Sequence, residues 1–322
     1  MQHSMAIAVS HRRKIRLRVI LLICLVMQAG LAAAATSILF VGNSFTFAWG
    51  SPVRFYRSDT VTDLNHQGVG GVPALFKSFT VQAGLDWDVY LEMQPGVGID
   101  WHYDNKLVVL GQRAWDRVAL LGFSTMDPKK PGDPTTLIQS AKAMAEFLQS
   151  RNPKADVHLE ATFPRADQVY DPKGAWYGKT VEDMARDVRA GNDKAAASHP
   201  AIKGVIPVGE AWIRAIQTGV ADRNPYDGVD AGKVNLWTYD HYHASMYGYY
   251  LKALVMFGYF TGRDPRSLGE NECSGFELGF SQAQITALQQ VAYDQLASSG
   301  TVAAMPFVLP RKEAQQRCSR GR

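Results

Sequence analysis

The chain has 322 residues, three cysteines and a formal net charge of +4. The positive excess comes from the N-terminus, because the first 35 residues hold five basic residues and no acidic one; without them the net charge is −1. The remaining chain is therefore too weakly charged to favour nucleic acid or an anionic surface as a partner, and its size suits one large α/β domain.

The N-terminus is typical of a secretory signal peptide. Basic residues gather in Arg12–Arg18, an apolar run covers Val19–Met27, and small residues end in Ala32–Ala35. The apolar run is shorter than the roughly 20 residues of a spanning helix, which disfavours the alternative of an uncleaved anchor. Cys24 lies inside this run and not at the cleavage point, so no lipid anchor is indicated. We expect cleavage near Ala35, no stable membrane insertion afterwards, and a periplasmic or secreted protein.

Residues 36–322 are expected to form one domain with a C-terminal tail, since no linker, repeat or low-complexity tract divides them. Short β-rich runs alternate with longer amphipathic runs, which predicts an α/β fold with a parallel sheet covered by helices on both faces. Five strands are predicted, at about 37–41, 61–65, 88–93, 156–162 and 204–208. Helical periodicity is clearest in 136–149, 181–197, 244–260 and 281–297.

Four long loops separate these elements, at 95–105, 126–134, 164–178 and 218–237. They are rich in Gly, Pro, Asp and aromatic residues and are long for a compact domain, so we expect them to shape the substrate side. After signal cleavage only Cys273 and Cys318 remain. They show no zinc-site spacing, and in an oxidising compartment they could pair and fix the tail.

A candidate nucleophile follows the first predicted strand, in the sequence Gly42-Asn43-Ser44. Ligands of open α/β sheets bind outside the carboxyl ends of the strands, which is where Ser44 is expected to lie. Taken alone, the tripeptide is more typical of a turn followed by a serine helix cap.

A candidate base and its partner lie in a second segment, Asp240-His241-Tyr242-His243, just before a predicted helix. A serine hydroxyl needs a base to accept its proton, and the base needs a group that holds its other ring nitrogen. Asp240 and His243 are three residues apart, so one turn of chain can bring the carboxylate to Nδ1 while Nε2 faces the serine. His241 has no aspartate at that spacing.

Together the two segments resemble the first and last motifs of the SGNH (GDSL-like) hydrolase superfamily. The first match extends over Ile38–Thr46, and the last runs from Asp240 through Gly248–Ala253 to Thr261–Pro265. This resemblance covers nearly the whole chain after the signal peptide. It implies a flavodoxin-like three-layer α/β/α sandwich and ester hydrolysis without a cofactor or metal, with a catalytic triad of Ser44, Asp240 and His243.

The resemblance also implies an oxyanion hole formed by Ser44 and by donors from two middle motifs. Gly70 fits the second motif best by its spacing from Asn65, with Gly71 close behind. The third motif of the superfamily ends in Asn-Asp, and this pair is missing at the end of the third predicted strand. The chain instead resembles a branch with glutamine at this strand end. The donor lies between Glu92 and Gln94, and we favour Gln94 because an ionised carboxylate cannot donate.

Export and the resemblance together predict an esterase acting on short acyl groups, acetyl foremost, of a small-molecule or glycan ester. The presumed loops carry aromatic residues that can stack on sugar rings or simply pack: Trp49, Trp101, Trp176, Trp237, Tyr239 and Tyr242. The alternatives are a lipase or thioesterase for longer acyl chains, and an acyltransferase that passes the acyl group to a hydroxyl. A catalytically inactive binding protein of the same fold is disfavoured by the complete triad.

Overall fold

The structure, a computed structural model, describes residues 35–302. The predicted signal peptide and Cys318 lie outside this range. A single sheet of six parallel strands runs through the domain in the order β2-β3-β1-β4-β5-β6. The strands are β1 (Thr36–Gly42), β2 (Thr62–Asp63), β3 (Trp87–Met93), β4 (Arg117–Leu120), β5 (Asp156–Ala161) and β6 (Ile202–Pro207).

The five-stranded prediction was one strand short, because it omitted β4. This strand has only four residues and begins with Arg117, so its apolar run is too short to stand out in a sequence window. It nevertheless lies in the middle of the sheet, between β1 and β5. Its neighbour β1 shows why the longer strands can be predicted from sequence. Residues Ile38–Val41 are all buried and apolar, as expected for a parallel strand covered on both faces.

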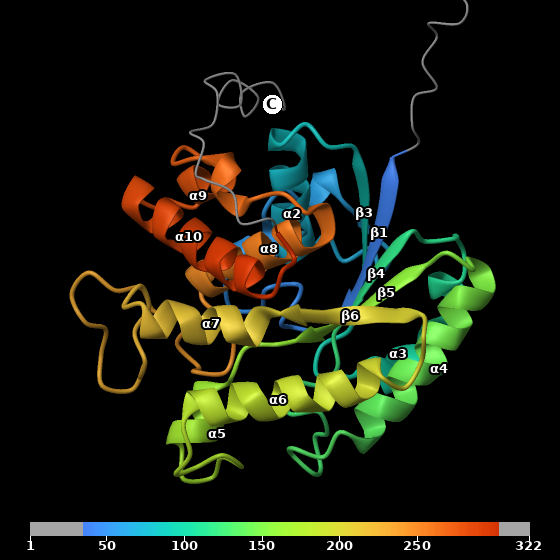
Figure 1. The fold of residues 1–322 in the computed structure, drawn as a ribbon, viewed down its shortest axis with the longest axis horizontal. Coiled ribbons are helices and arrows are strands. Elements are labelled where there is room, and N and C mark those ends of the chain that lie inside the picture. Colours follow the sequence, from blue (N-terminus) through green and yellow to red (C-terminus); the bar gives the residue numbers. More distant parts are fainter. Residues whose placement is uncertain (1–34, 303–322) are drawn as a thin grey trace, which may run out of the picture. The chain divides into compact units, whose positions relative to one another are not determined.

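Helices cover both faces of the sheet, so the predicted three-layer α/β/α sandwich is confirmed (Figure 1). One face carries α2 (Gly71–Gln82), α8 (Met246–Thr261) and α10 (Gln282–Ser298), and the other carries α3 (Ile99–Leu110), α4 (Thr135–Arg151) and α6 (Val181–Ala196). Helix α7 (Val208–Gln217) follows β6 directly. The shorter helices are α5 (Ala166–Tyr170), α9 (Cys273–Glu277), η1 (Pro52–Phe55), η2 (Ser58–Thr60) and η3 (Pro265–Leu268).

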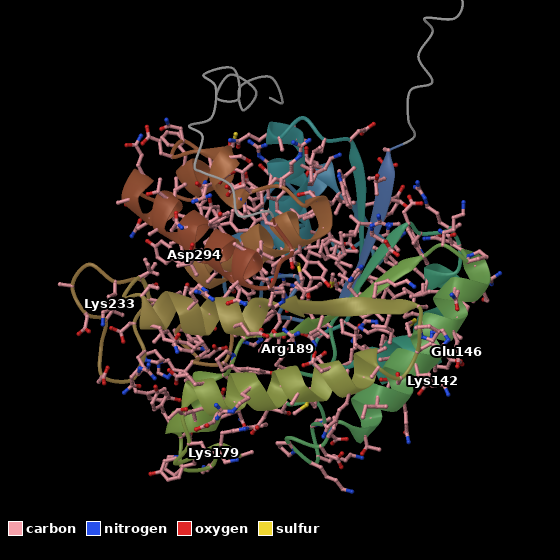
Figure 2. All side chains as sticks on the ribbon, in the orientation of Figure 1. Lys142, Glu146, Lys179, Arg189, Lys233 and Asp294 are labelled. Carbon is pink, nitrogen blue, oxygen red and sulfur yellow. The ribbon has the colours of Figure 1, made fainter. Side chains whose placement is uncertain are left out.

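The outer helices are amphipathic, and their ends are capped. Helix α4 buries an apolar stripe against the sheet while Lys142 and Glu146 project outward, as Figure 2 shows. Helix α10 begins with a capping box, in which the Ser281 and Gln284 side chains each bind the other's backbone N–H. By contrast, α8 is buried along most of its length, so its polar residues face other parts of the protein.

Two further observations concern membrane-spanning helices and the disulfide. No helix within residues 35–302 is long and apolar enough to cross a membrane. Cys273 is disulfide-bonded, while its expected partner Cys318 lies outside the described range.

The carboxyl ends of the strands meet at one edge of the sheet, as parallel strands require. The segment after β1 carries Ser44, the segment after β3 carries Gln94, and the segment after β5 carries Arg165. The 237–245 segment, which carries Asp240 and His243, precedes α8 at the same edge. The fold therefore brings together residues that lie about 200 positions apart in sequence.

Candidate active site

The turn that carries Ser44 is held by the side chain of Asn43. The Asn43 amide donates to the carbonyls of Val97, at 2.9 Å, and Gly122, at 3.3 Å, which ties the turn to the loops after β3 and β4. The Asn43 side-chain oxygen accepts the backbone N–H of Phe45 at 3.1 Å. Both sides of the amide are thus engaged. Asn43 therefore has a structural role that the interpretation of Gly42-Asn43-Ser44 as a turn did not reveal.

Ser44, His243 and Asp240 form one hydrogen-bonded chain. The Ser44 Oγ lies 2.9 Å from the Nε2 of His243, whose Nδ1 lies 2.6 Å from the Oδ2 of Asp240. The other oxygen of Asp240 accepts the backbone N–H groups of Tyr242 and His243, at 3.0 and 2.8 Å. Ser44 and His243 are each only 7% exposed. The structure therefore brings the three predicted residues together in the order that a serine nucleophile requires.

The surroundings of the pair favour a neutral histidine beside an ionised aspartate. Burial lowers the pKa of His243, and although Asp240 acts in the opposite direction, the pKa stays below its ordinary value. Burial would raise the pKa of Asp240, but hydrogen bonds from the ring and backbone of His243 outweigh it and lower that pKa. A neutral imidazole with Nδ1–H directed at the carboxylate leaves Nε2 free to accept the Ser44 proton.

His241 is directed elsewhere. Its backbone adopts a left-handed conformation, with φ of 55°, and its ring centre lies 3.9 Å from that of Tyr226. Its carbonyl accepts the backbone N–H of Asp167 at 3.1 Å. His241 thus shapes the loop, and the spacing argument that preferred His243 agrees with the geometry.

Aromatic rings enclose the catalytic imidazole. The Phe45 and His243 rings form a T-shaped pair with ring centres 5.4 Å apart, and Phe45 stacks on Phe163 at 4.5 Å. Tyr242, the residue before His243, has the Arg165 guanidinium 3.6 Å from its ring centre. Sequence reasoning missed Phe163 and Arg165, because both follow β5 and only the sheet topology brings that strand end to the triad.

The backbone hydrogen bonds distinguish between two of the candidate oxyanion donors, the N–H groups of Ser44 and Gly70. Within residues 35–302 the Ser44 N–H has no hydrogen-bond partner, so it is free to bind a ligand. The Gly70 N–H, in contrast, donates to the carbonyl of Arg54 at 2.8 Å. A donor that is already engaged cannot stabilise a developing charge without breaking that bond, so this geometry does not favour Gly70.

Gly71 is better placed than Gly70. A Cβ on Gly70 would collide with the Tyr56 carbonyl, which explains that glycine by packing away from the nucleophile turn. A Cβ on Gly71 would instead collide with the carbonyl of Thr46 and the backbone of Phe47, so Gly71 lies directly against the turn that carries Ser44. Its φ of 61° also requires glycine, and its N–H has no partner among the described residues.

Glu92 and Gln94 have different surroundings at the end of β3. Glu92 is buried, accepts the side-chain amide of Asn65 at 2.9 Å and forms an ion pair with His102. Burial would raise its pKa, but the contacts with His102 and Asn65 lower it, which disfavours a protonated Glu92. The Gln94 backbone N–H donates to the Gly42 carbonyl at 3.0 Å, while its side-chain amide has no partner in the described range. Gln94 therefore stays the better donor candidate.

A cavity of about 340 Å³ shares a wall with the triad segment. It is lined by residues 50–52, which follow the nucleophile turn, and by Asn235, residues 237–239 and residues 245–247, which flank the catalytic segment on both sides. Tyr239, beside Asp240, is 79% exposed at its edge, and Trp49 is 41% exposed next to Gly50. The aromatic and polar lining suits part of a bound substrate.

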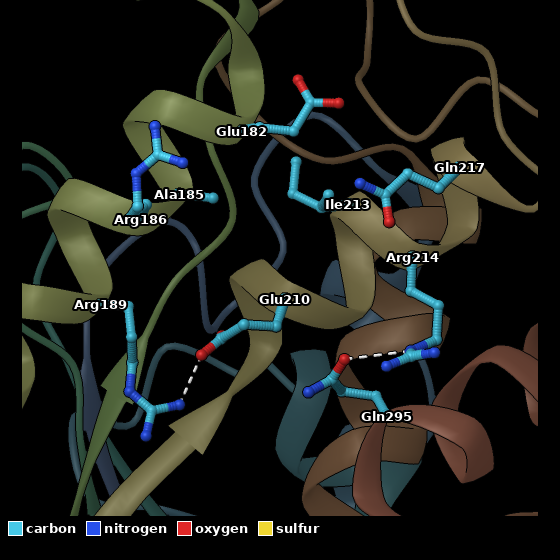
Figure 3. Close-up of a pocket in the computed structure, with 9 residues that line it drawn as sticks. All are labelled: Glu182, Ala185, Arg186, Arg189, Glu210, Ile213, Arg214, Gln217 and Gln295. Carbon is cyan, nitrogen blue, oxygen red and sulfur yellow. Dashed lines mark hydrogen bonds and ion pairs between the residues drawn. The ribbon is translucent and has the colours of Figure 1, made fainter. Parts of the chain in front are cut away.

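A second cavity, of about 370 Å³, lies between α6, α7 and α10 (Figure 3). None of its nine lining residues is Ser, Cys or His, so it offers no nucleophile. Its charged groups bind one another: Arg189 pairs with Glu210, and Arg214 donates to Gln295 at 3.1 Å. It does not compete with the triad as an active site. In residues 35–302 no group of three or more His, Cys, Asp or Glu is arranged to hold a metal ion.

Comparisons with known proteins bear on the fold. A DUF4886 family protein from Bacteroides uniformis is 16% identical with a TM-score of 0.56, covering 84% of this chain and 98% of its own. A protein from Slackia heliotrinireducens proposed to be an SGNH hydrolase is 21% identical with a TM-score of 0.46 (69% and 97% covered), and a Clostridium thermocellum family 3 carbohydrate esterase is 15% identical with a TM-score of 0.46 (70% and 95% covered). No protein-family model and no curated protein matches the chain. At these identities the first likeness establishes the fold.

Proposed function

We propose that this protein is an SGNH-type serine esterase. The observation that carries the proposal is the continuous contact from Ser44 Oγ to His243 Nε2, at 2.9 Å, and from His243 Nδ1 to Asp240, at 2.6 Å. This geometry is reached on a sheet edge where α/β proteins bind ligands, and it uses the residues that the two sequence motifs select. A binding protein of the same fold would have no need for this alignment.

In the proposed reaction, Ser44 Oγ attacks the ester carbonyl while its proton moves to His243 Nε2. The carbonyl oxygen becomes an oxyanion, for which Ser44 N–H, Gly71 N–H and the Gln94 amide are the candidate donors. The ester C–O bond then breaks, and the leaving alcohol takes the proton from His243. Water attacks the acyl group on Ser44 and gives a proton to His243. Release of the carboxylic acid returns that proton to Ser44.

We infer that the substrate is a short acyl ester, acetyl foremost, on a carbohydrate. Two features support this substrate. The cavity beside the triad segment has an aromatic and polar lining that includes Tyr239, and the side chains of Tyr239 and Trp49 are both exposed. Rings at such positions can stack on a sugar while hydroxyl and amide groups bind its hydroxyls. We also propose, from the basic and apolar N-terminal sequence alone, that the protein is exported to the periplasm or the medium.

Hydrolysis rates against p-nitrophenyl esters of increasing chain length, followed by acetyl release from acetylated polysaccharides, test this function. Acetyl and propionyl esters should be turned over fastest, with a steep fall at longer chains. Faster turnover of octanoyl than acetyl esters would favour the lipase or thioesterase alternative. Adding an alcohol acceptor and measuring ester formation distinguishes an acyltransferase, and a protein inert toward all of these esters would contradict the proposal.

A further inference from the structure

Two buried basic side chains bind the backbone on either side of Ser44, and the triad uses neither of them. The His102 Nε2 lies 3.0 Å from the carbonyl oxygen of Gly42, two residues before the nucleophile. The Lys252 Nζ donates to the carbonyl oxygen of Phe45, the residue after it, at 2.9 Å. Both basic side chains are 0% exposed. The nucleophile is thus bracketed by two carbonyls that each have a side-chain donor.

Each basic residue has its own buried acid. His102 Nδ1 forms an ion pair with Glu92, and Lys252 Nζ lies 2.8 Å from Glu160 Oε1. Because its two ring nitrogens face a carboxylate and a carbonyl, His102 can donate to the carbonyl while its other side is held by Glu92. The acids therefore fix where the two donors point.

The four side chains come from every layer of the sandwich. Glu92 lies on β3 and Glu160 on β5, whereas His102 lies on α3 and Lys252 on α8, on opposite faces of the sheet. The turn between β1 and the following segment is therefore held from both faces. A contact formed by both helix layers can resist displacement in either direction.

Stability alone does not account for these pairs. Burying two charges costs desolvation free energy, and well-packed apolar residues of the same volume often stabilise a fold equally well. Apolar residues cannot, however, donate a directed hydrogen bond to a carbonyl. The feature that the ion pairs add is therefore the fixed orientation of the peptide groups around Ser44.

We propose that His102 and Lys252 are positioning residues that fix the Ser44 turn, so that Oγ stays within hydrogen-bond distance of His243. The inference rests on the proposed esterase function. A displacement of the nucleophile by a fraction of an ångström weakens both proton transfer and attack, whereas the substrate cavity is left intact. The effect of losing either donor should consequently fall on the rate of attack by Ser44 and leave KM little changed.

The first test compares His102→Leu with His102→Gln. Leucine cannot donate to the Gly42 carbonyl, while the glutamine amide can reach a position close to that of Nε2. We expect His102→Leu to lower kcat for p-nitrophenyl acetate by about 10- to 100-fold, the scale of a small misplacement of a reacting group. His102→Gln should recover most of that loss. A fluorophosphonate, whose fluoride is displaced by Ser44 Oγ, gives a second measure of attack. Its reaction should be slowest in His102→Leu and close to the wild-type rate in His102→Gln.

The second test removes the other donor without leaving an unpaired buried charge, through the double variant Lys252→Met with Glu160→Gln. We expect kcat for p-nitrophenyl acetate and the rate of reaction with the fluorophosphonate to fall by factors comparable to those for His102→Leu. The matched control is Gln289→Leu, because the Gln289 amide also binds a backbone carbonyl inside the protein, that of Gly269 at 2.9 Å. This control should lower Tm but keep the rate of attack, as any merely structural role would.

The outcomes separate the two proposals. Slower attack in His102→Leu and in the Lys252 double variant, rescue in His102→Gln and a normal rate in Gln289→Leu would support the positioning role. Wild-type rates in the folded variants, or equal losses in His102→Leu and His102→Gln, would overturn it while the esterase proposal stands. A wild-type protein that neither hydrolyses esters nor reacts with the fluorophosphonate would overturn the esterase proposal itself.

Discussion

The carboxylate of Asp240 binds His243 twice. Its Oδ2 lies 2.6 Å from the ring Nδ1, and its Oδ1 accepts the backbone N–H of the same residue at 2.8 Å. The ring and the chain that carries it are therefore oriented by one side chain three residues earlier. A single short segment sets both the rotamer and the tautomer of the base, which explains how the chain can place two triad members without help from another strand.

Replacing Asp240 with asparagine should separate these two effects. The asparagine oxygen can still accept the backbone N–H, so the loop should fold, but its amide would face Nδ1 and favour the tautomer with the proton on Nε2. Because that tautomer cannot accept the Ser44 proton, we expect kcat for p-nitrophenyl acetate to fall by up to about 10⁴-fold, as in serine proteases. A Tm near that of the wild type would show that folding is intact. A loss of only a few-fold would contradict the proposed role of Asp240.

The two histidines of the catalytic segment should respond differently to alanine. His243→Ala removes the base and should abolish measurable esterase activity, as should Ser44→Ala, which removes the attacking oxygen. His241→Ala should lose only a few-fold, since the His241 ring lies on Tyr226 and contacts neither Ser44 nor Asp240. Purified variants can be compared on p-nitrophenyl acetate, with circular dichroism as the control for folding. Equal losses at both histidines would show that the base is misassigned.

The acidic limb of the pH profile should lie below the ordinary histidine value. His243 must be neutral to act as a base, and burial lowers its pKa, with Arg165 acting in the same direction and Asp240 and Asp167 in the opposite one. Activity should therefore persist to a lower pH than a histidine with the ordinary value near 6.5 would allow. The dependence of kcat/KM on pH measures this, because it reports the free enzyme. A limb above 6.5 would contradict the expectation.

Arg165 gives that expectation a sharper test. Its guanidinium pairs with Asp167 at 2.5 Å and lies over the Tyr242 ring. Arg165→Gln removes a positive charge near His243 and leaves Asp167 unpaired, and both changes favour the protonated ring. The acidic limb of kcat/KM should consequently move to higher pH. The same variant in 1 M salt should shift less, because salt screens the aspartate. An unchanged limb would show that Arg165 has no electrostatic influence on the base.

The sequence allowed most of the fold to be predicted, since long buried strands and amphipathic helices carry clear periodicity. It did not reveal β4, which is four residues long, or α3, whose first turns fall in the stretch 95–105 that was expected to be a loop. Helix α3 contains a mixture of charged and apolar residues without a clean apolar stripe. Short central strands and mixed helices form because of their neighbours, and a single sequence window cannot show those neighbours.

The same division holds at the site. Ser44, Asp240 and His243 could be predicted because each lies in a short motif with a chemical reason for its spacing. The contacts that hold them could not, since Lys252 reads as an ordinary helix residue and Glu160 as part of a strand. The choice of Gly70 over Gly71 rested on spacing alone, whereas the structure distinguishes the two by the hydrogen bond from Gly70 to Arg54 and by the contact of Gly71 with the nucleophile turn. Hydrogen-bond occupancy is a three-dimensional property that adjacent glycines do not reveal in sequence.

The oxyanion hole provides the last prediction, which concerns Gln94. Its backbone N–H donates to the Gly42 carbonyl at 3.0 Å, next to the nucleophile turn. The Gln94 side chain therefore lies at the carboxyl end of the strands, as Ser44 does. An amide donates at every pH, whereas the neighbouring Glu92 already accepts bonds from Asn65 and pairs with His102. We therefore expect Gln94→Ala to lower kcat by about 10²- to 10³-fold with KM little changed, the loss typical of one oxyanion donor.

A matched variant, Gln94→Glu, keeps the size of the side chain and the backbone bond to Gly42 but replaces the donor with an acceptor. It should be at least as slow as Gln94→Ala at neutral pH and should recover activity as the pH falls, because a protonated carboxyl group can donate. Both variants share the acidic limb set by His243, so the ratio of kcat for Gln94→Glu to kcat for Gln94→Ala at each pH isolates this recovery. If Gln94→Ala and Gln94→Glu both retain wild-type kcat, the oxyanion is bound by the backbone N–H groups of Ser44 and Gly71 without the side chain.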